Sequence, residues 1–149
     1  KLSRSGFPVL ALDLRGMGET APGKPSPSGR NYFGVDCKEA FLSLHLGRPL
    51  LRQRVLDVLS ILNAPYHSPP HGYHLIGIGS AGPIALHAAA LDGRINRVEL
   101  RQSIVSWSAV VESPISVNQL CTAIPSTLAT YDLPDLTDLI APREIVVRE

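Results

Sequence analysis

The sequence predicts an α/β fold, in which a mostly parallel sheet carries helices on both faces. Short apolar runs that are typical of buried strands alternate with segments of helical periodicity along the chain. The glycine-rich turn GIGSAG, residues 77–82, joins one such run directly to a helical segment. Hydrophobic residues make up 44% and charged residues 18% of the 149 positions, an ordinary globular balance. We therefore expect residues 1–149 to form one domain with a single core.

The beginning of the chain predicts a strand, a loop and a helix. Residues 7–16, FPVLALDLRG, form an apolar run bounded by Pro and Gly, as in a buried parallel strand. Residues 17–34 are dense in Gly, Pro and Ser and predict a long surface loop. Asp36, with Glu39 three residues on, predicts a capping box for a helix over about 37–46.

The rest of the chain alternates strands with helices, which indicates βαβ units and a parallel sheet. Apolar residues continue through 111 and predict that the strand beginning at residue 95 extends that far. Residues 113–132 predict a surface segment with a short helix. The expected helices are residues 49–62, 81–93 and 133–142, and the expected strands are residues 73–79, 95–100 and 143–149.

Composition excludes several classes of partner and site. The net charge is +1 and the Lys and Arg residues are scattered, so we expect no binding of nucleic acid or of a membrane surface. No apolar run is long enough to span a bilayer, and the compartment stays open. Cys37 and Cys121 lie far apart without a C-x-x-C pair, so we expect two reduced, buried thiols and no metal site. The histidines of YHSPPHGYH, residues 66–74, favour a polar loop over a metal cluster.

The turn GIGSAG supports two hypotheses. Gly77, Gly79 and Gly82 fit the G-x-G-x-x-G fingerprint of a dinucleotide site that holds NAD(P) or FAD. Glu99 stands at the end of the next expected strand, where an acid that binds a ribose hydroxyl is found. Small residues are also selected by any tight strand-to-helix turn, so the glycine pattern alone does not decide between hypotheses.

The alternative is the elbow that presents the catalytic serine of an α/β-hydrolase. GIGSAGPIALH resembles an elbow in which G-x-S-x-G-G runs into a helix reading I-A-L-H. Counted back from that helix, the nucleophile position falls on Gly79, which cannot attack a substrate. Ser80 then lies where the elbow contributes its backbone N–H to the oxyanion hole. With Ser80 as nucleophile instead, the β-branched Ile78 would occupy a position that requires a small residue.

Three further segments resemble the acetyl xylan esterase and cephalosporin deacetylase group of α/β-hydrolases. They are VLALDLRGMGET at 9–20, which is closest to a bacterial branch with an R-G-x-G-E-T loop, GRPLLRQRVLDVLSIL at 47–62, and YDLPDLTDLIAPREIVV at 131–147. The resemblance implies a partial hydrolase fold, the central-to-late portion of the domain. It also implies a carboxylic-ester hydrolase that forms an acyl-enzyme, acts on a small-molecule or carbohydrate ester and needs no cofactor. Arg15 and Glu19 would then lie near the active-site end of the sheet.

Serine hydrolysis needs a catalytic triad of a nucleophile, a histidine base and an acid, and this triad is not complete in the sequence. In α/β-hydrolases an acid and a histidine follow the nucleophile, and the resemblance implies an aspartate in the loop after residues 143–147 and a histidine beyond it. Glu149 stands at about that loop, and we expect it to be a solvated carboxylate rather than the acid. His87 is the single histidine after the turn, and we expect it to be a packing or surface residue. Asp132, Asp135 and Asp138 recur at helical spacing and predict a helix cap and solvated positions. We therefore expect an esterase lineage without triad catalysis in this chain, with Ser80 as the one nucleophile candidate on the elbow. The alternative is a degenerate hydrolase-fold domain that binds a carbohydrate or a partner protein; Trp107 is a candidate pocket residue.

Overall fold

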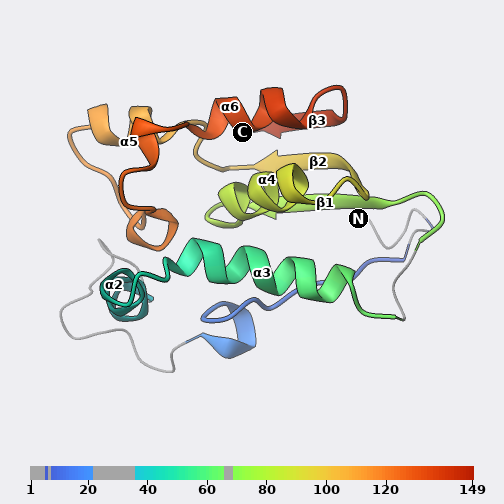
Figure 1. The fold of residues 1–149 in the computed structure, drawn as a ribbon, viewed down its shortest axis with the longest axis horizontal. Coiled ribbons are helices and arrows are strands. Elements are labelled where there is room, and N and C mark those ends of the chain that lie inside the picture. The colour runs from blue at the N-terminus through green and yellow to red at the C-terminus, as the bar shows by residue number, and fades with distance from the viewer. Residues whose placement is uncertain (1–5, 7, 22–35, 66–68) are drawn as a thin grey trace.

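The computed structural model describes residues 6, 8–21, 36–65 and 69–149 (Figure 1). Three parallel strands form a sheet in the order β1 (Tyr73–Ile78), β2 (Ile95–Arg101) and β3 (Glu144–Arg148). Helices connect and cover these strands, which confirms the predicted α/β class.

The α-helices are α2 (Cys37–His45), α3 (Leu50–Leu62), α4 (Ala81–Leu91), α5 (Trp107–Glu112) and α6 (Leu133–Ile140). Three short 3₁₀ helices of the described residues, η2 (Gly18–Thr20), η3 (Leu120–Thr122) and η4 (Thr127–Ala129), lie in the connections. α4 packs against β1 and β2 and also contacts α3 and α6, which lie on either side of it in Figure 1. Within the described ranges, no helix is long and apolar enough to cross a membrane.

Residue alternation along the strands divides the sheet into two chemically different faces. Leu75, Val98 and Leu100 belong to the hydrophobic core with the α4 residues Ile84 and Ala88. The alternate positions of the strands carry ion pairs, which join Arg97 to Glu144 and Glu99 to Arg101, Arg148 and His74. One face therefore packs on helix α4 through the hydrophobic effect, and the other is held by charges.

The predicted strand over 7–16 is not formed. Residues 8–14 have no regular secondary structure, and residue 7 lies outside the described residues. Leu14 is nevertheless buried in the main core. The backbone carbonyl of Arg15 accepts a hydrogen bond from Arg54 Nε of α3 at 3.0 Å, so the end of the apolar run is held against a helix. The predicted burial is also wrong for most of the run, because Val9 and Leu10 are each more than half exposed. An apolar run becomes part of a sheet only where a neighbouring strand pairs with it.

Three other predictions are corrected in detail. α2 forms over the expected residues, but Asp36 makes no side-chain cap at its start and instead accepts a hydrogen bond from Arg54. β2 ends at Arg101 rather than continuing through 111, because Gln102 adopts a positive φ of 49° and α5 follows. The short helix expected within 113–132 is present as two 3₁₀ helices. Most of the predicted loop, residues 22–34, lies outside the described residues.

Candidate functional site

The turn between β1 and α4 has its apex at Gly79. Gly79 adopts a φ of +57° and donates its backbone N–H to the Arg101 carbonyl at 2.9 Å. Ser80 is already helical, with φ −64° and ψ −12°, and it is the N-cap of α4 without a side-chain cap hydrogen bond. A side chain built at Gly79 would meet no other atom within 4 Å. The residue held in the strained, open position of the turn is therefore Gly79.

The other two glycines of the motif have packing roles. A Cβ at Gly77 would lie 2.7 Å from the Ala81 carbonyl oxygen, so the strand approaches the first turn of α4 too closely for a side chain. A Cβ at Gly82 would lie 1.8 Å from Ser103 Oγ. Both contacts are far shorter than van der Waals distance. The fingerprint glycines are thus accounted for by the turn and by close helix packing, without a bound phosphate.

His87 has both ring nitrogens engaged. Nδ1 donates to the Pro83 carbonyl at 2.6 Å, and because a carbonyl can only accept, Nε2 is left to accept from the Tyr131 hydroxyl at 2.8 Å. Burial lowers the pKa of the imidazole, against a smaller opposing effect of the Pro83 carbonyl. His87 therefore joins α4 to the segment before α6 as a neutral packing residue, as expected from the sequence, and does not serve as a base for Ser80.

Asp132 is a structural cap, as its position before a helix predicts. Its carboxylate accepts hydrogen bonds from the backbone N–H of Leu133 at 2.6 Å and Trp107 at 2.7 Å. Burial alone would raise the pKa of Asp132, but these backbone donors outweigh it and hold the pKa well below its usual range. Asp135 completes the capping box of α6 by accepting from the Asp132 N–H at 2.7 Å. Asp138 is exposed on α6.

The structure also shows the surroundings of two acidic residues at the sheet, Glu99 and Glu149. Glu99 is buried, and its carboxylate pairs with Arg101 Nε at 2.8 Å and Arg148 Nε at 2.7 Å. The hydrogen bond from Arg101 lowers the pKa of Glu99 against the opposing effect of burial. The carboxylate that the dinucleotide hypothesis assigns to a ribose is therefore bound by two arginines of the sheet. Glu149 is exposed and follows β3.

Arg15 and Glu19 belong to a loop that is tied to α3. Arg15 Nε donates to Asp57 Oδ2 at 2.7 Å, and its Nη1 donates to Gln53 Oε1 at 2.7 Å. The Glu19 backbone N–H donates to Asp13 Oδ2 at 3.0 Å, while the Glu19 side chain is exposed. The side-chain contacts of Arg15 are thus directed to a helix surface, and they fix the loop.

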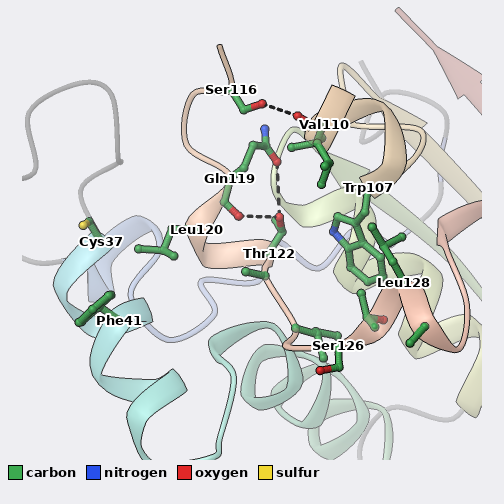
Figure 2. A pocket seen from close by; sticks show the side chains of 15 residues that line it. Cys37, Phe41, Trp107, Val110, Ser116, Gln119, Leu120, Thr122, Ser126 and Leu128 are labelled. Carbon is green, nitrogen blue, oxygen red and sulfur yellow. Dashed lines mark hydrogen bonds between the residues drawn. The ribbon is translucent and has the colours of Figure 1, made fainter. Parts of the chain in front are cut away.

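A cavity of about 710 Å³ lies between α2, α5 and the connection from α5 to α6. Figure 1 shows these segments on the side of the molecule toward which the strands point. In open parallel sheets, ligands bind at the carboxyl ends of the strands. Among the described residues that line the cavity there is no Asp, Glu, Lys, Arg or His. Its walls include the side chains of Phe41, Trp107, Val110, Leu120 and Leu128 (Figure 2).

Two buried polar atoms in this wall have no partner. Within the part of the chain that the structure describes, Trp107 Nε1 and Thr127 Oγ1 make no hydrogen bond. Trp107 is the one lining residue that the sequence predicted as a pocket residue. The remaining wall was missed, although apolar residues such as Leu120, Ile124 and Leu128 recur through an otherwise polar connection. These recurring apolar residues are the sequence signal that could have indicated the cavity wall.

The thiols and histidines form no metal centre in the described ranges, where no group of three or more His, Cys, Asp or Glu residues converges. Cys37 and Cys121 are both free thiols; Cys121 is buried, whereas Cys37 is partly exposed in the cavity wall, contrary to the expectation of burial. Burial raises the pKa of the Cys121 thiol. His74 lies within β1, and His67 lies outside the described residues.

Comparison with known proteins does not place the chain in a family. No protein-family description, no curated protein and no solved structure matches it.

Proposed function

We propose that this chain is an α/β-hydrolase-like domain of esterase lineage that performs no serine hydrolysis at its elbow and acts by binding. The observation that carries the proposal is the positive φ of +57° at Gly79, the apex of the strand-to-helix turn. An elbow holds its nucleophile at this strained position, where the side chain projects away from the sheet. Here that position carries glycine, which supports an elbow-type turn that lacks the attacking group.

The neighbouring serine does not replace the missing nucleophile. Ser80 has helical backbone angles as the N-cap of α4, one residue past the apex. A serine hydroxyl needs a base within hydrogen-bond reach to become nucleophilic. His87, the one histidine that follows the turn in this sequence, lies on the same helix and bonds Pro83 and Tyr131 instead. These contacts favour a binding role over acyl transfer at Ser80.

The dinucleotide alternative has less support. Gly77 and Gly82 are required by the contacts with Ala81 and Ser103, so they are no independent sign of a phosphate. Glu99 is engaged by Arg101 and Arg148. A ribose hydroxyl would have to displace two arginines from the Glu99 carboxylate, whose side chain is 4% exposed.

The test compares hydrolysis of p-nitrophenyl acetate by wild-type protein, Ser80→Ala and Gly79→Ser. We expect all three to release p-nitrophenol at the buffer rate. A wild-type rate above buffer that is lost in Ser80→Ala would overturn the proposal, because it would identify Ser80 as the nucleophile.

A second arm addresses the nucleotide alternative. We expect no rise in melting temperature with millimolar NAD or NADP, because a ligand that binds only the folded state raises stability by mass action. A rise that is abolished by Glu99→Gln, with the fold retained, would favour the dinucleotide hypothesis over ours.

A further inference from the structure

We propose that the cavity beside Trp107 binds a neutral, mainly apolar small molecule through a carbonyl oxygen, which accepts a hydrogen bond from the indole N–H of Trp107. This inference rests on the proposed binding role and names the class of ligand. The cavity is distinct from the elbow, since neither Gly79 nor Ser80 lines it.

The size and lining of the cavity fit a small ligand. Its volume of about 710 Å³ lies within the range of pockets that enclose drug-sized molecules. Such pockets combine apolar walls with a few polar groups that orient the ligand. The side chains of Phe41, Val110, Leu120 and Leu128 supply apolar walls here, and Figure 2 shows them arranged around the same space as Trp107.

The indole of Trp107 supplies an unused donor. Trp107 is 6% exposed, and its Nε1 has no hydrogen-bond partner among the residues that the structure describes. In Figure 2 the ring nitrogen lies on the side of the indole that faces Thr122 across the cavity. An indole nitrogen can only donate, and a buried donor without an acceptor is costly. A ligand oxygen at this place would remove that cost.

The position of this donor is fixed before any ligand arrives. The Asp132 carboxylate holds the Trp107 backbone N–H at 2.7 Å. The indole packs at ring-centroid distances of 5.7 Å from His87 and 5.9 Å from Tyr131. These contacts keep the ring from turning to find another acceptor. A donor held in place in this way costs little to order when a ligand binds.

Thr127 offers a second unused group in the same wall. Its Oγ1 is buried and unpartnered, and a hydroxyl both donates and accepts. Ser116 and Thr122, two other polar side chains of the wall, already have partners. Ser116 Oγ donates to the Val110 carbonyl at 2.7 Å, and Thr122 Oγ1 donates to the Gln119 carbonyl at 2.9 Å. The free hydrogen-bonding capacity of buried side chains is therefore concentrated at Trp107 and Thr127.

The absence of charged side chains in the described wall excludes an ionic ligand. A buried carboxylate or ammonium group needs a counter-charge or several strong hydrogen bonds to offset its lost hydration. One indole N–H and one hydroxyl do not supply them. A ketone or an ester, with one oxygen acceptor on an apolar body, matches both the walls and the donor.

The test uses three phenylalkyl probes of similar shape in calorimetric titrations of the protein. They are benzylacetone, which carries a ketone, butylbenzene, which carries no oxygen, and hydrocinnamate, which carries a carboxylate. We expect benzylacetone to bind the wild-type protein. Trp107→Phe should weaken its affinity roughly fivefold, which corresponds to the loss of one hydrogen bond. The affinity for butylbenzene should stay unchanged in this variant. Hydrocinnamate should bind more weakly than the ketone.

Thr127→Val tests the second group without the loss of an aromatic ring. This nearly isosteric change should weaken benzylacetone binding by a smaller factor. Thr130→Val, the same change at an exposed position outside the cavity wall, is the matched control and should have no effect. Equal ketone affinity in wild type, Trp107→Phe and Thr127→Val would overturn the proposal, and so would hydrocinnamate binding as tightly as the ketone.

The two proposals fail separately. Ester hydrolysis that depends on Ser80, together with ketone binding that depends on Trp107, would refute only the proposed function. Lack of ketone binding by a protein that also lacks hydrolysis would refute only the cavity assignment.

Discussion

The carboxylate of Asp132 accepts a hydrogen bond from the backbone N–H of Trp107 at 2.7 Å, across 25 residues of sequence. The same carboxylate caps α6 through Leu133 and receives the Ser106 hydroxyl at 2.9 Å. One aspartate thus stabilises the amino-terminal ends of α5 and α6 together, where backbone N–H groups lack partners within the helix. The link also positions the indole in the cavity wall.

Replacing Asp132 by alanine should therefore destabilise the fold more than loss of an ordinary cap. An N-cap change to alanine costs up to about 2 kcal/mol. Here α6 loses its cap, and α5, which keeps its own N-cap Ser106, loses the acceptor of the Trp107 and Ser108 N–H groups. We therefore expect a loss of at least about 2 kcal/mol in urea unfolding. Asp138→Ala on the exposed side of α6 is the control and should stay within about 0.5 kcal/mol. A loss for Asp132→Ala no larger than the control would contradict the double-cap role.

The same carboxylate predicts a pH dependence. Its pKa is held below the ordinary value in the folded state, so its stabilisation is fully present above the unfolded pKa of about 3.9 and is lost as pH falls toward the folded pKa. Wild-type stability should drop below about pH 4, and Asp132→Asn should show a shallower drop in parallel melts. Identical slopes for the two proteins would show that other acids dominate.

Gly79→Ala should destabilise the protein through the backbone alone. A side chain there meets no atom within 4 Å, but the φ of +57° places an L-residue in the left-handed region, at a cost of about 1–2 kcal/mol. Gly93→Ala is the matched control, because Gly93 also has open space around its Cβ and has no positive φ. Urea unfolding should show a loss for Gly79→Ala only. Equal effects at both sites would mean that the turn relaxes and that Gly79 is not its strained apex.

Asp36→Ala should be among the most damaging single changes. Arg54 is 1% exposed, and its Nη2 donates to Asp36 Oδ2 at 2.7 Å. Removing the carboxylate leaves a buried guanidinium without its counter-charge, which costs roughly 3–5 kcal/mol. Glu144→Ala removes one partner of the more exposed pair with Arg97 and should cost about 1 kcal/mol or less.

The double variant Asp36→Ala with Arg54→Met separates charge from packing. Because it removes both charges, it should be more stable than Asp36→Ala alone. A double variant at least as unstable as the single one would show that Arg54 acts mainly through the Arg15 carbonyl.

His87 should titrate below the ordinary imidazole pKa of about 6.5, because burial disfavours its charged form. The unfolded chain then takes up this proton at a higher pH than the folded one, so stability should fall as pH drops below about 6.5. Tyr131→Phe removes the donor to Nε2 and should raise the pKa of His87. NMR titration of the His87 ring checks both, and an ordinary pKa in the wild type would contradict its buried, neutral role.

Sequence patterns predicted most of the elements correctly and some of their ends incorrectly. The periodicity of residues 49–62 predicted helix α3, and Leu51, Val55 and Val58 of that helix all lie in the core. Asp36 looked like a capping residue but pairs with Arg54, which is 18 residues away. A local rule identifies residues that are able to cap a helix. It does not reveal a buried arginine on another helix that competes for the same carboxylate.

By itself, the sequence determined the α/β class and the helix periodicities, because these depend on neighbours a few positions apart. Glycine at the apex followed from counting residues, and the positive φ agrees with that count. The tertiary structure alone decided that residues 8–14 form no strand, that Glu99 is engaged by Arg101 and Arg148, and that the α5–α6 connection and α2 line one open cavity. Each of these depends on contacts between distant segments, and a periodic pattern in one segment carries no information about what packs against it.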